Sequence, residues 1–264
     1  MYWPDKVRSF INRYLRIDKD FLIREQVLNY IIPYEYRDNA YNFRIFGKSI
    51  ELRNLSSDLI VYKQVFLDEE YSFAIELYHE YFDANPKLIL DIGANIGLTS
   101  LYFYSKFNNP DLVIIAVEPE LQNFIQLKKN TSAYNSIKVL NNAIWNKAGK
   151  LSISNQFRDG RSWSYQVVES EGFQFVQSIT LKEILQHTKV QVIDIFKMDV
   201  EGAEKQIILE YDELGQILRN TRIICVEIHD SVVSRIDITK KLVDFGFHIY
   251  AKNETLYGVN KNTF

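Results

Sequence analysis

The residues of this chain best suited to chemistry are acidic or polar side chains that follow apolar runs. Five such positions are Asp91, Glu118, Asn142, Asp199 and Glu227. Short apolar runs are typical of the buried strands of a parallel sheet, and ligands of such sheets bind beyond the carboxyl ends of the strands. The pattern therefore predicts a single cleft lined with hydrogen-bond acceptors.

The first of these positions begins a glycine-rich turn, which reads Asp91-Ile-Gly-Ala-Asn-Ile-Gly97 and lies between an apolar run and a predicted helix. Glycine lets the backbone approach a ligand closely, and a helix start offers free N–H groups. We therefore expect the turn to bind a cofactor, through Asp91, Gly93, Ala94, Asn95 and Gly97.

The turn lacks the third glycine of the dinucleotide fingerprint, and the chain has no P-loop Lys-Ser/Thr. Asp91, directly before the turn, repels a pyrophosphate and favours a cation. Glu118 ends the next predicted strand, where an acidic side chain binds ribose hydroxyls. S-adenosylmethionine has a ribose and positive charge but no phosphate, so these residues favour a methyltransferase over an NAD(P)-dependent oxidoreductase of the same fold.

Four residues are candidates for the base that removes the proton of an acceptor hydroxyl: Asp199, Glu201, Glu227 and His229. Such a base contributes about 10²–10⁴-fold to the rate. His229 has the most suitable ordinary pKa, although a structural hydrogen bond at the strand end explains it equally well. Glu201 also suits the start of a helix. Asp199, Glu227 and His229 offer ligands for a divalent cation, but we expect no metal.

Several segments of the chain resemble the FkbM family of S-adenosylmethionine-dependent methyltransferases. They are Asp91–Gly97, Val117-Glu-Pro119, Asn142-Ala143, Lys197-Met-Asp-Val-Glu-Gly-Ala-Glu204 and Glu227-Ile-His229. They occur in the family's order over about residues 60–245. The resemblance implies an α/β class I methyltransferase (Rossmann-like) fold with a mostly parallel seven-stranded sheet. It also implies O-methylation of hydroxyls on sugars, glycans or polyketide-like metabolites.

The resemblance also implies roles by position. Asp91, Gly93, Ala94 and Asn95 would line the amino-acid part of S-adenosylmethionine, Glu118 would hold its ribose, and Asn142 and Ala143 would flank its adenine. Asp199 would lie near the transferred methyl group. The chain departs from the family at Leu181-Lys182, where the family has Leu-Asp. We expect this difference to affect a helix start and not the activity.

Residues 157–165 are the best candidate for a substrate loop, because they combine aromatic rings with arginines. Trp163 and Tyr165 offer faces for sugar rings, and Arg158 and Arg161 could bind a phosphate or a uronate. The alternative is a surface hairpin with an aromatic anchor. We expect a small-molecule or glycan acceptor.

From residue 86 onward the pattern predicts alternating strands and helices, with helices on both faces of the sheet. Strands are predicted at 88–92, 112–117, 137–140, 192–198 and 222–228, and helices at 96–106, 120–132, 180–187, 235–245 and a segment ending near 211. Residues 147–180 are predicted to form strands around a loop at Asp159-Gly160, and a pair of strands closes the chain. We assign residues 86–264 to the methyltransferase domain.

Residues 1–85 are expected to form an N-terminal extension. We predict a helix over 5–32, short antiparallel strands over 41–66 with a turn at Gly47, and a helix from Leu67 to Phe82. Residues 5–19 form a basic amphipathic face near Trp3, which could lie on an anionic membrane. We favour a helix packed on the domain or a contact between copies of the chain.

Composition narrows the class of protein further. The net charge of -3 in 264 residues gives no reason to expect nucleic acid as a partner. Cys225, the one cysteine, lies in an apolar run and is expected to be a buried core thiol. No apolar run is long enough to span a bilayer, so we expect a soluble cytoplasmic protein. A non-catalytic binding module and a membrane-attached form of the same enzyme remain as alternatives.

Overall fold

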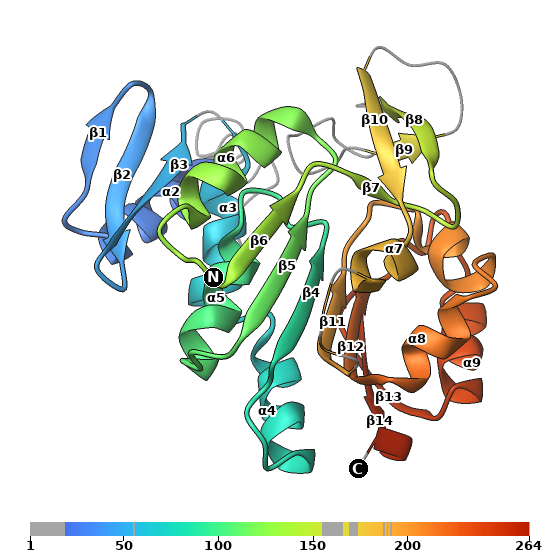
Figure 1. Ribbon diagram of the computed structural model, residues 1–264. Helices are drawn as coiled ribbons and strands as arrows, with labels where there is room; N and C mark the ends of the chain where they lie inside the picture. Colours follow the sequence, from blue (N-terminus) through green and yellow to red (C-terminus); the bar gives the residue numbers. More distant parts are fainter. Residues whose placement is uncertain are drawn as a thin grey trace, which may run out of the picture. The chain divides into compact units, whose positions relative to one another are not determined.

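The computed structural model describes residues 19–54, 56–154, 166–168, 174–186, 188, 190 and 192–263 (Figure 1). The chain divides into two compact units, Met1–Glu69 and Glu70–Phe264. The predicted substrate loop and residues 5–18 of the predicted basic helix lie outside the described residues. The segment Leu67–Phe82, which we placed in the extension, falls mostly in the second unit.

The first unit is built on a three-stranded antiparallel sheet. Helix α2 (Lys19–Tyr30) precedes β1 (Glu35–Arg37), β2 (Ala40–Ile45) and β3 (Lys48–Arg53). Ile45 pairs with Lys48, so the predicted turn at Gly47 is a two-residue hairpin turn, Phe46-Gly47. Ile50 and Leu52 alternate with polar residues along β3 and are fully buried, as expected for a sheet with one core face.

The prediction of a strand over 59–66 is wrong. This segment forms helix α3 (Asp58–Tyr62) and the π-helical η1 (Lys63–Leu67). Leu59, Tyr62 and Val65 are buried at a spacing of three residues, which is a helical period that the β-branched residues between them concealed. The Arg53 side chain and backbone N–H both donate hydrogen bonds to the Asp58 carboxylate, which fixes the chain where α3 begins.

The second unit contains the predicted seven-stranded sheet. Its strands are β4 (Leu88–Ile92), β5 (Val113–Val117), β6 (Ile137–Leu140), β11 (Ile193–Met198), β12 (Thr221–Glu227), β13 (Phe247–Lys252) and β14 (Thr255–Asn260). Their order is β13-β14-β12-β11-β4-β5-β6. Only β14 runs antiparallel to its neighbours within this sheet, which is the arrangement of the class I methyltransferase fold.

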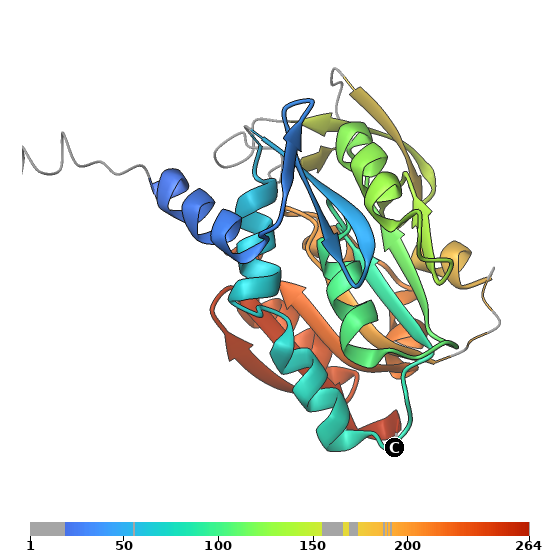
Figure 2. The ribbon, with the colours of Figure 1, turned by 90° about the vertical axis from the view of Figure 1, so that its left-hand side faces the viewer.

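Helices cover both faces of this sheet (Figures 1 and 2). One face carries α4 (Ser72–Tyr81), α5 (Leu98–Phe107) and α6 (Leu121–Thr131), and the other carries α7 (Leu181–Gln186), α8 (Leu214–Arg219) and α9 (Arg235–Asp244). Leu88, Leu90 and Ile92 pack in one core cluster with residues of α7, α8 and α9. Asp91 faces the other side, where Ser100 of α5 contacts it. Strand β4 is therefore buried on both faces, as its continuous apolar sequence predicts.

Residues 143–179 form a smaller sheet beside the main one. Its strands are β7 (Ala143–Ile144), β8 (Gly149–Ser154), β9 (Gln166–Val168) and β10 (Gln174–Ile179), in the order β7-β10-β8-β9. This confirms the prediction of strands over 147–180, while the loop at Asp159-Gly160 lies outside the described residues. In the chain, this sheet follows the carboxyl end of β6 and precedes β11.

Two helical segments of the second unit differ from the sequence-based expectations. The predicted helix that ends near residue 211 is the π-helical segment η2 (Lys205–Leu209). Helix α8 was not expected, because Gly215 lowers helix propensity. A Cβ on Gly215 would lie 2.6 Å from the Phe245 ring, so this glycine allows α8 to pack closely against that ring.

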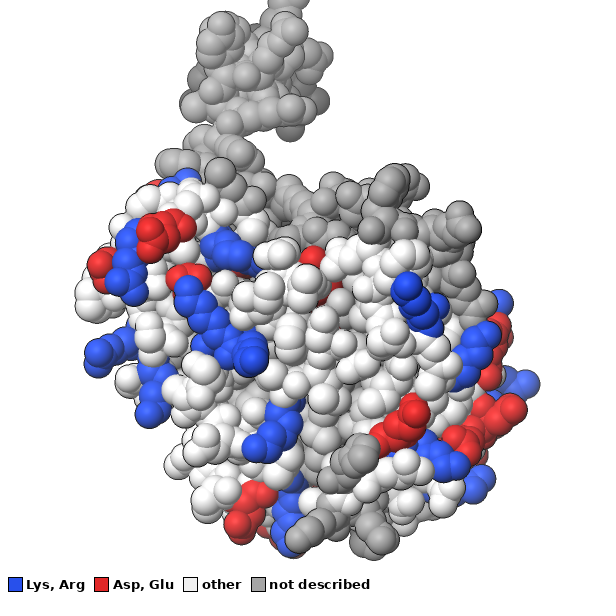
Figure 3. Space-filling view, turned by 45° about the horizontal axis from the view of Figure 1, so that its top comes forward, with Lys and Arg blue, Asp and Glu red and all other residues white. Residues whose placement is uncertain are grey.

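Two further expectations concern the core and the surface. Cys225 is buried, as predicted, and burial raises the pKa of its thiol. No helix in the described part of the chain has the length and apolar character that crossing a membrane requires. On the face shown in Figure 3, basic and acidic residues that are described lie interspersed with each other.

Candidate active site

The glycine turn after β4 is shaped by a close approach of two strand ends. Gly93 has φ +76°, and a Cβ added to it would lie 1.7 Å from the carbonyl oxygen of Asp199. The Asp199 N–H also donates to the carbonyl of Ile92 at 3.0 Å. No side chain larger than hydrogen fits at residue 93, because a real Cβ does not approach a backbone oxygen this closely. The turn thus joins the ends of β4 and β11 in one site.

A buried ion pair lies beneath this turn. Lys197 Nζ is 3.2 Å from Asp91 Oδ1 and donates a hydrogen bond to the Gly93 carbonyl at 2.7 Å. Ser100 Oγ donates to the other Asp91 oxygen at 2.6 Å. Burial would lower the pKa of Lys197, but the charges of Asp91 and Asp199 outweigh burial and raise this pKa. Asp91 therefore supports the turn from below, through its contacts with Lys197 and Ser100.

Glu118, at the end of β5, holds the next part of the site. Its two oxygens accept hydrogen bonds from the backbone N–H groups of Asn95, at 2.8 Å, and Glu120, at 3.0 Å. Burial raises the pKa of Glu118 to about 7 in spite of these bonds. The side-chain amide of Asn141 donates a hydrogen bond to the carbonyl oxygen of Glu118 at 2.9 Å, which fixes the backbone after β5. Glu118 is thereby fixed against the glycine turn, where sequence reasoning placed the ribose.

A second cluster follows β11 and β12, around the buried ring of His229. Its Nε2 lies 3.1 Å from Glu201 Oε2 and 3.8 Å from Glu227 Oε1, and its Nδ1 contacts Glu204 Oε1. Burial would lower the pKa of His229, but hydrogen bonds to Glu201 and Glu204 outweigh burial and raise it to about 10. The ring thus lies between carboxylates that favour its protonated form.

The cluster contains more carboxylates than cations. The charge of Asp199 and, after it, burial raise the pKa of Glu227 to about 9. The side chains of Asp199, Glu227 and Glu201 keep exposures of 28%, 19% and 13%, whereas the His229 side chain has none. The three carboxylates, unlike the ring, therefore reach the surface from which a ligand would enter.

Asp199, Glu201 and His229 each offer one ligand atom within 4.8 Å of the others, which is a spacing suited to a metal ion. This set differs from the one considered from the sequence by having Glu201 in place of Glu227. A metal ion here would bind His229 as a neutral imidazole, so its binding would displace a proton from the ring.

The structure gathers most of the predicted cofactor-binding residues but not all predicted site residues. Asp91, Gly93 and Asp199 converge, and Asn95 bonds to Glu118. Asn142 follows β6 and donates to the Gln177 carbonyl at 3.1 Å. Ala94 and Ala143 are buried, and Gly97 packs on Leu127. The predicted substrate-binding residues lie outside the described residues; they are Arg158, Arg161, Trp163 and Tyr165.

Sequence reasoning missed three supporting residues. Ser100 holds Asp91, Asn141 holds the backbone at Glu118, and Glu204 holds His229. Glu204 is the last residue of the motif Lys197–Glu204, so the resemblance to the FkbM family could have identified it as a site residue. Ser100 lies three residues after Gly97, on the first turn of α5, where nothing in its type distinguishes it from an ordinary helix residue.

The site fits S-adenosylmethionine on two observations. The first is the glycine cradle at Gly93, which a Cβ would fill. The second is a pair of buried oxygens, Asn95 Oδ1 and Asp199 Oδ1, that have no hydrogen-bond partner among the described residues. Buried acceptors of this kind require donors, and a ligand with an ammonium group supplies them. The surplus of carboxylates likewise suits a ligand that carries positive charge.

Comparison with known proteins places this site in a family. Methyltransferase sdnD of Sordaria araneosa is 28% identical over 224 residues, which cover 72% of this chain and 82% of that protein. The methyltransferase FkbM from Methylobacillus flagellatus has a similar structure, with a TM-score of 0.50 and 14% identity over 76% of this chain and 53% of that one. The match therefore spans about half of the Methylobacillus chain.

A third similar structure is the N-terminal domain of EvdMO1 with SAH bound, with a TM-score of 0.46 and 12% identity over 93% of this chain and 98% of that one. The model of the methyltransferase FkbM domain matches residues 91–249, which is more than half of the chain. That match begins at Asp91, the first residue of the glycine turn, and ends in β13, the last strand but one along the chain. This chain belongs to the FkbM methyltransferase family.

Proposed function

We propose that the protein transfers a methyl group from S-adenosylmethionine to a hydroxyl of a sugar, a glycan or a related metabolite. The observation that carries the proposal is the convergence of Asp91, Gly93 and Asp199 around one turn, with the Glu118 carboxylate fixed beside it. The methyl donor is S-adenosylmethionine, which supplies an electrophilic methyl group on a sulfonium. The acceptor class is supported by the family resemblance and by the carboxylates at the strand ends.

Each part of the donor has a group to hold it in this proposal. The backbone of Gly93 and Ala94 and the oxygens of Asn95 and Asp199 hold the amino-acid end. The Glu118 carboxylate, which already accepts two backbone hydrogen bonds, accepts a further one from a ribose hydroxyl through a remaining lone pair. Asn142 and Ala143 lie after β6 and flank the adenine. This division follows the order of the strand ends across the sheet.

The proposed base is Glu201, and His229 positions it. The His229 ring is wholly buried and protonated at neutral pH, so it cannot take a proton from an acceptor. Glu227 has a pKa of about 9 and is itself protonated at pH 7. Glu201 lies 3.1 Å from His229 Nε2 and keeps some exposure. As the acceptor oxygen bonds to the methyl carbon, its proton passes to the Glu201 carboxylate, and the methyl carbon–sulfur bond breaks with its electron pair left on sulfur.

Calorimetric titration with S-adenosylmethionine and, separately, with NAD⁺ and NADP⁺ tests the donor. We expect heat with S-adenosylmethionine and none with the nicotinamide cofactors. The reverse result would replace the methyltransferase assignment with the oxidoreductase alternative, and no heat with any of them would favour a non-catalytic module.

The base is tested by Glu201→Gln with transfer of a labelled methyl group to a panel of saccharides. We expect kcat to fall about 10²–10⁴-fold with donor affinity unchanged. Glu210→Gln, an exposed carboxylate that pairs with Lys205, is the matched control and should retain full turnover. Full turnover of the Glu201 variant would exclude Glu201 as the base.

A further inference from the structure

The first unit contains a pocket of about 710 Å³ whose lining includes none of the residues assigned above to the donor or to the base. It lies on the three-stranded sheet and is lined by the α2–β1 connection, by β1, β2 and β3, and by residues of α3 and η1. Its volume is within the usual range of small-molecule sites, roughly 300–1,000 Å³. Every residue that lines it lies between Tyr30 and Phe66, so the pocket belongs to this unit alone.

Aromatic rings form one end of this pocket. Phe43 and Tyr62 are buried and meet edge to face with ring centroids 5.4 Å apart, and Phe66 stacks on Tyr62 at 4.9 Å. Around them, the rings of Tyr30 and Phe46 are 61% and 58% exposed. Exposed rings at the rim of a concave surface offer flat apolar faces on which the C–H face of a sugar ring can stack.

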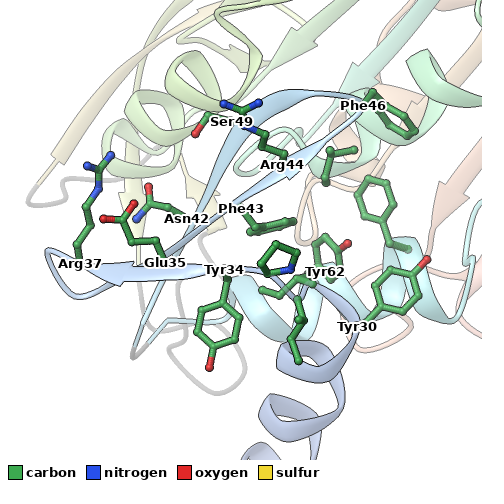
Figure 4. A pocket seen from close by; sticks show the side chains of 15 residues that line it. Tyr30, Tyr34, Glu35, Arg37, Asn42, Phe43, Arg44, Phe46, Ser49 and Tyr62 are labelled. Carbon is green, nitrogen blue, oxygen red and sulfur yellow. The ribbon is translucent and has the colours of Figure 1, made fainter.

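The other end of the pocket is polar and contains unpaired arginine. Figure 4 shows Arg37, Glu35 and Asn42 together at this end, with Phe43 between them and the rings of Tyr30 and Phe46. Arg44 and Ser49, which face each other across β2 and β3, line a second edge. Within the described part of the chain, neither Arg37 nor Arg44 has an ion pair, a hydrogen bond from its guanidinium or a ring contact.

The other described arginines all have partners. They are Arg24 over the Tyr41 ring, Arg53 with Asp58, Arg219 over the Phe245 ring, Arg222 with Asp194 and Arg235 with Asp230. Arg37 and Arg44 therefore stand apart because their planar donor groups are available to a ligand. A guanidinium binds a carboxylate or a phosphate through two parallel hydrogen bonds.

The backbone at Phe46 supplies an independent observation. Phe46 has φ +50° in the two-residue turn that joins β2 to β3, and Gly47 follows with φ +77°. Such turns favour Asn-Gly, and a bulky residue with a positive φ is unusual and strained. Here the strained position carries an aromatic ring that is mostly exposed on the pocket rim. Backbone strain of this kind gathers at functional sites, and here it presents an aromatic ring at the pocket rim.

We propose that this pocket binds an acidic saccharide, with its sugar rings on Phe46 and Tyr30 and its carboxylate or phosphate groups on Arg37 and Arg44. Asn42 and Ser49 are suited to hydrogen bonds with its hydroxyls. The concave shape, with charged groups at its polar end and along one edge, favours a ligand that enters the pocket over a flat lipid surface. That this saccharide is the methyl acceptor rests on the proposed function. That the pocket binds it rests on the pocket residues alone.

The test is binding to the full-length protein without a methyl donor. The probes are tetragalacturonate, a phosphorylated maltooligosaccharide, neutral maltotetraose, and vesicles of phosphatidylcholine with phosphatidylserine. We expect at least one acidic saccharide to bind at least about tenfold more tightly than maltotetraose, since charge-assisted hydrogen bonds are about twice as strong as neutral ones. Equal or absent binding of both acidic saccharides, or binding of the vesicles alone, would overturn the proposal.

Three variants locate the binding. Arg44→Gln should weaken binding of the acidic saccharide about tenfold or more, since it removes a bidentate charged contact. Lys48→Gln, an exposed lysine on β3 outside the pocket lining, is the matched control and should bind as the unchanged protein does. Phe46→Asn should weaken binding while raising Tm by about 2–4 °C, because Asn suits the positive φ.

This last pair of results separates a binding role from a structural one. A Phe46 that only stabilised the fold would show a lower Tm in Phe46→Asn, and unchanged binding in that variant would remove the ring from the site. The same preparations, titrated with S-adenosylmethionine, show independently whether the proposed function fails. Loss of donor binding with retained saccharide binding would leave the pocket assignment standing.

Discussion

The Glu204 carboxylate and the His229 ring are both wholly buried and contact each other through Glu204 Oε1 and His229 Nδ1. Glu201 approaches the other ring nitrogen at 3.1 Å. This arrangement favours protonation of both ring nitrogens, which argues against His229 among the four candidate bases. Glu204 is thereby a positioning residue, which holds the ring that in turn holds Glu201.

Replacing Glu204 by Gln should lower the pKa of His229 below about 10, because the variant loses one of the carboxylate charges that stabilise the imidazolium. NMR titration of labelled histidines measures this pKa, and the spectrum of His229→Gln assigns the resonance. Glu210→Gln, which changes an exposed carboxylate, should leave the pKa in place. A His229 pKa that does not fall in Glu204→Gln would contradict the assigned contact.

The raised pKa of His229 also predicts how stability depends on pH. The folded pKa is about 10 and the ordinary value is 6.5, so the folded state binds more protons between these values. The contribution of the group is complete below pH 6.5 and is lost as the pH rises through about 10. Urea unfolding at pH 6 and pH 9 should show a larger fall in the free energy of unfolding for the wild type than for His229→Gln. Equal falls in the free energy of unfolding of the two proteins would argue against a raised pKa of His229.

The Asp199 charge is the first cause of the raised pKa of Glu227. Asp199→Asn should therefore move that pKa from about 9 toward the ordinary 4.5, although burial keeps it above that value. Carbon-detected NMR of labelled Glu side chains measures the change, with Asp230→Asn as a control at an exposed aspartate that pairs with Arg235. Donor binding should also weaken in Asp199→Asn, and an unchanged donor Kd would remove Asp199 from the donor site.

Gly93→Ala should abolish donor binding, because its Cβ would overlap the Asp199 carbonyl and separate the ends of β4 and β11. Gly47→Ala is a matched control for backbone strain alone: Gly47 also has a positive φ, but nothing lies within 4 Å of an added Cβ. We expect Gly47→Ala to cost about 1 kcal/mol of folding free energy and to leave donor binding intact. Calorimetry and chemical unfolding of both variants measure the two effects. Full donor affinity in Gly93→Ala would exclude the cradle.

Lys197→Met should destabilise the fold by about 3–5 kcal/mol, because it leaves the Asp91 carboxylate buried without its cation. The double variant Lys197→Met with Asp91→Asn should recover part of the loss, since no uncompensated charge remains. Lys205→Met, in an exposed pair with Glu210, should change stability little. Urea unfolding ranks the variants, and equal effects of the two lysine substitutions would contradict a buried ion pair.

The periodicity of the sequence was sufficient to predict the strands of the main sheet, because the central parallel strands β4, β5, β11 and β12 are buried on both faces and appear as apolar runs. It failed at residues 59–66, where a run rich in β-branched residues forms helix through contacts within the first unit. It also missed α8, whose Gly215 is explained by the Phe245 ring that packs on it. Both errors arise where tertiary packing overrides local preference.

In the site, residue type and strand position predicted which side chains would converge but not their protonation. His229 was a candidate base because its ordinary pKa suits that task. The contacts with Glu201 and Glu204 that reverse this expectation join residues about 25 positions apart, and nothing in the local sequence of His229 reveals them. Asp91 stays a predicted donor residue, and the sequence did not reveal that its two oxygens also contact Lys197 and Ser100.

The contact between Gly93 and the Asp199 carbonyl has a consequence for how fast the donor binds and leaves. The turn is fixed by backbone atoms and by the Lys197 hydrogen bond to the Gly93 carbonyl, so its conformation does not depend on a ligand. A preformed site loses little conformational entropy when a ligand arrives, and association then approaches the rate set by diffusion and orientation. Substitutions among the carboxylates around the turn should accordingly change the residence time of the donor more than its rate of arrival.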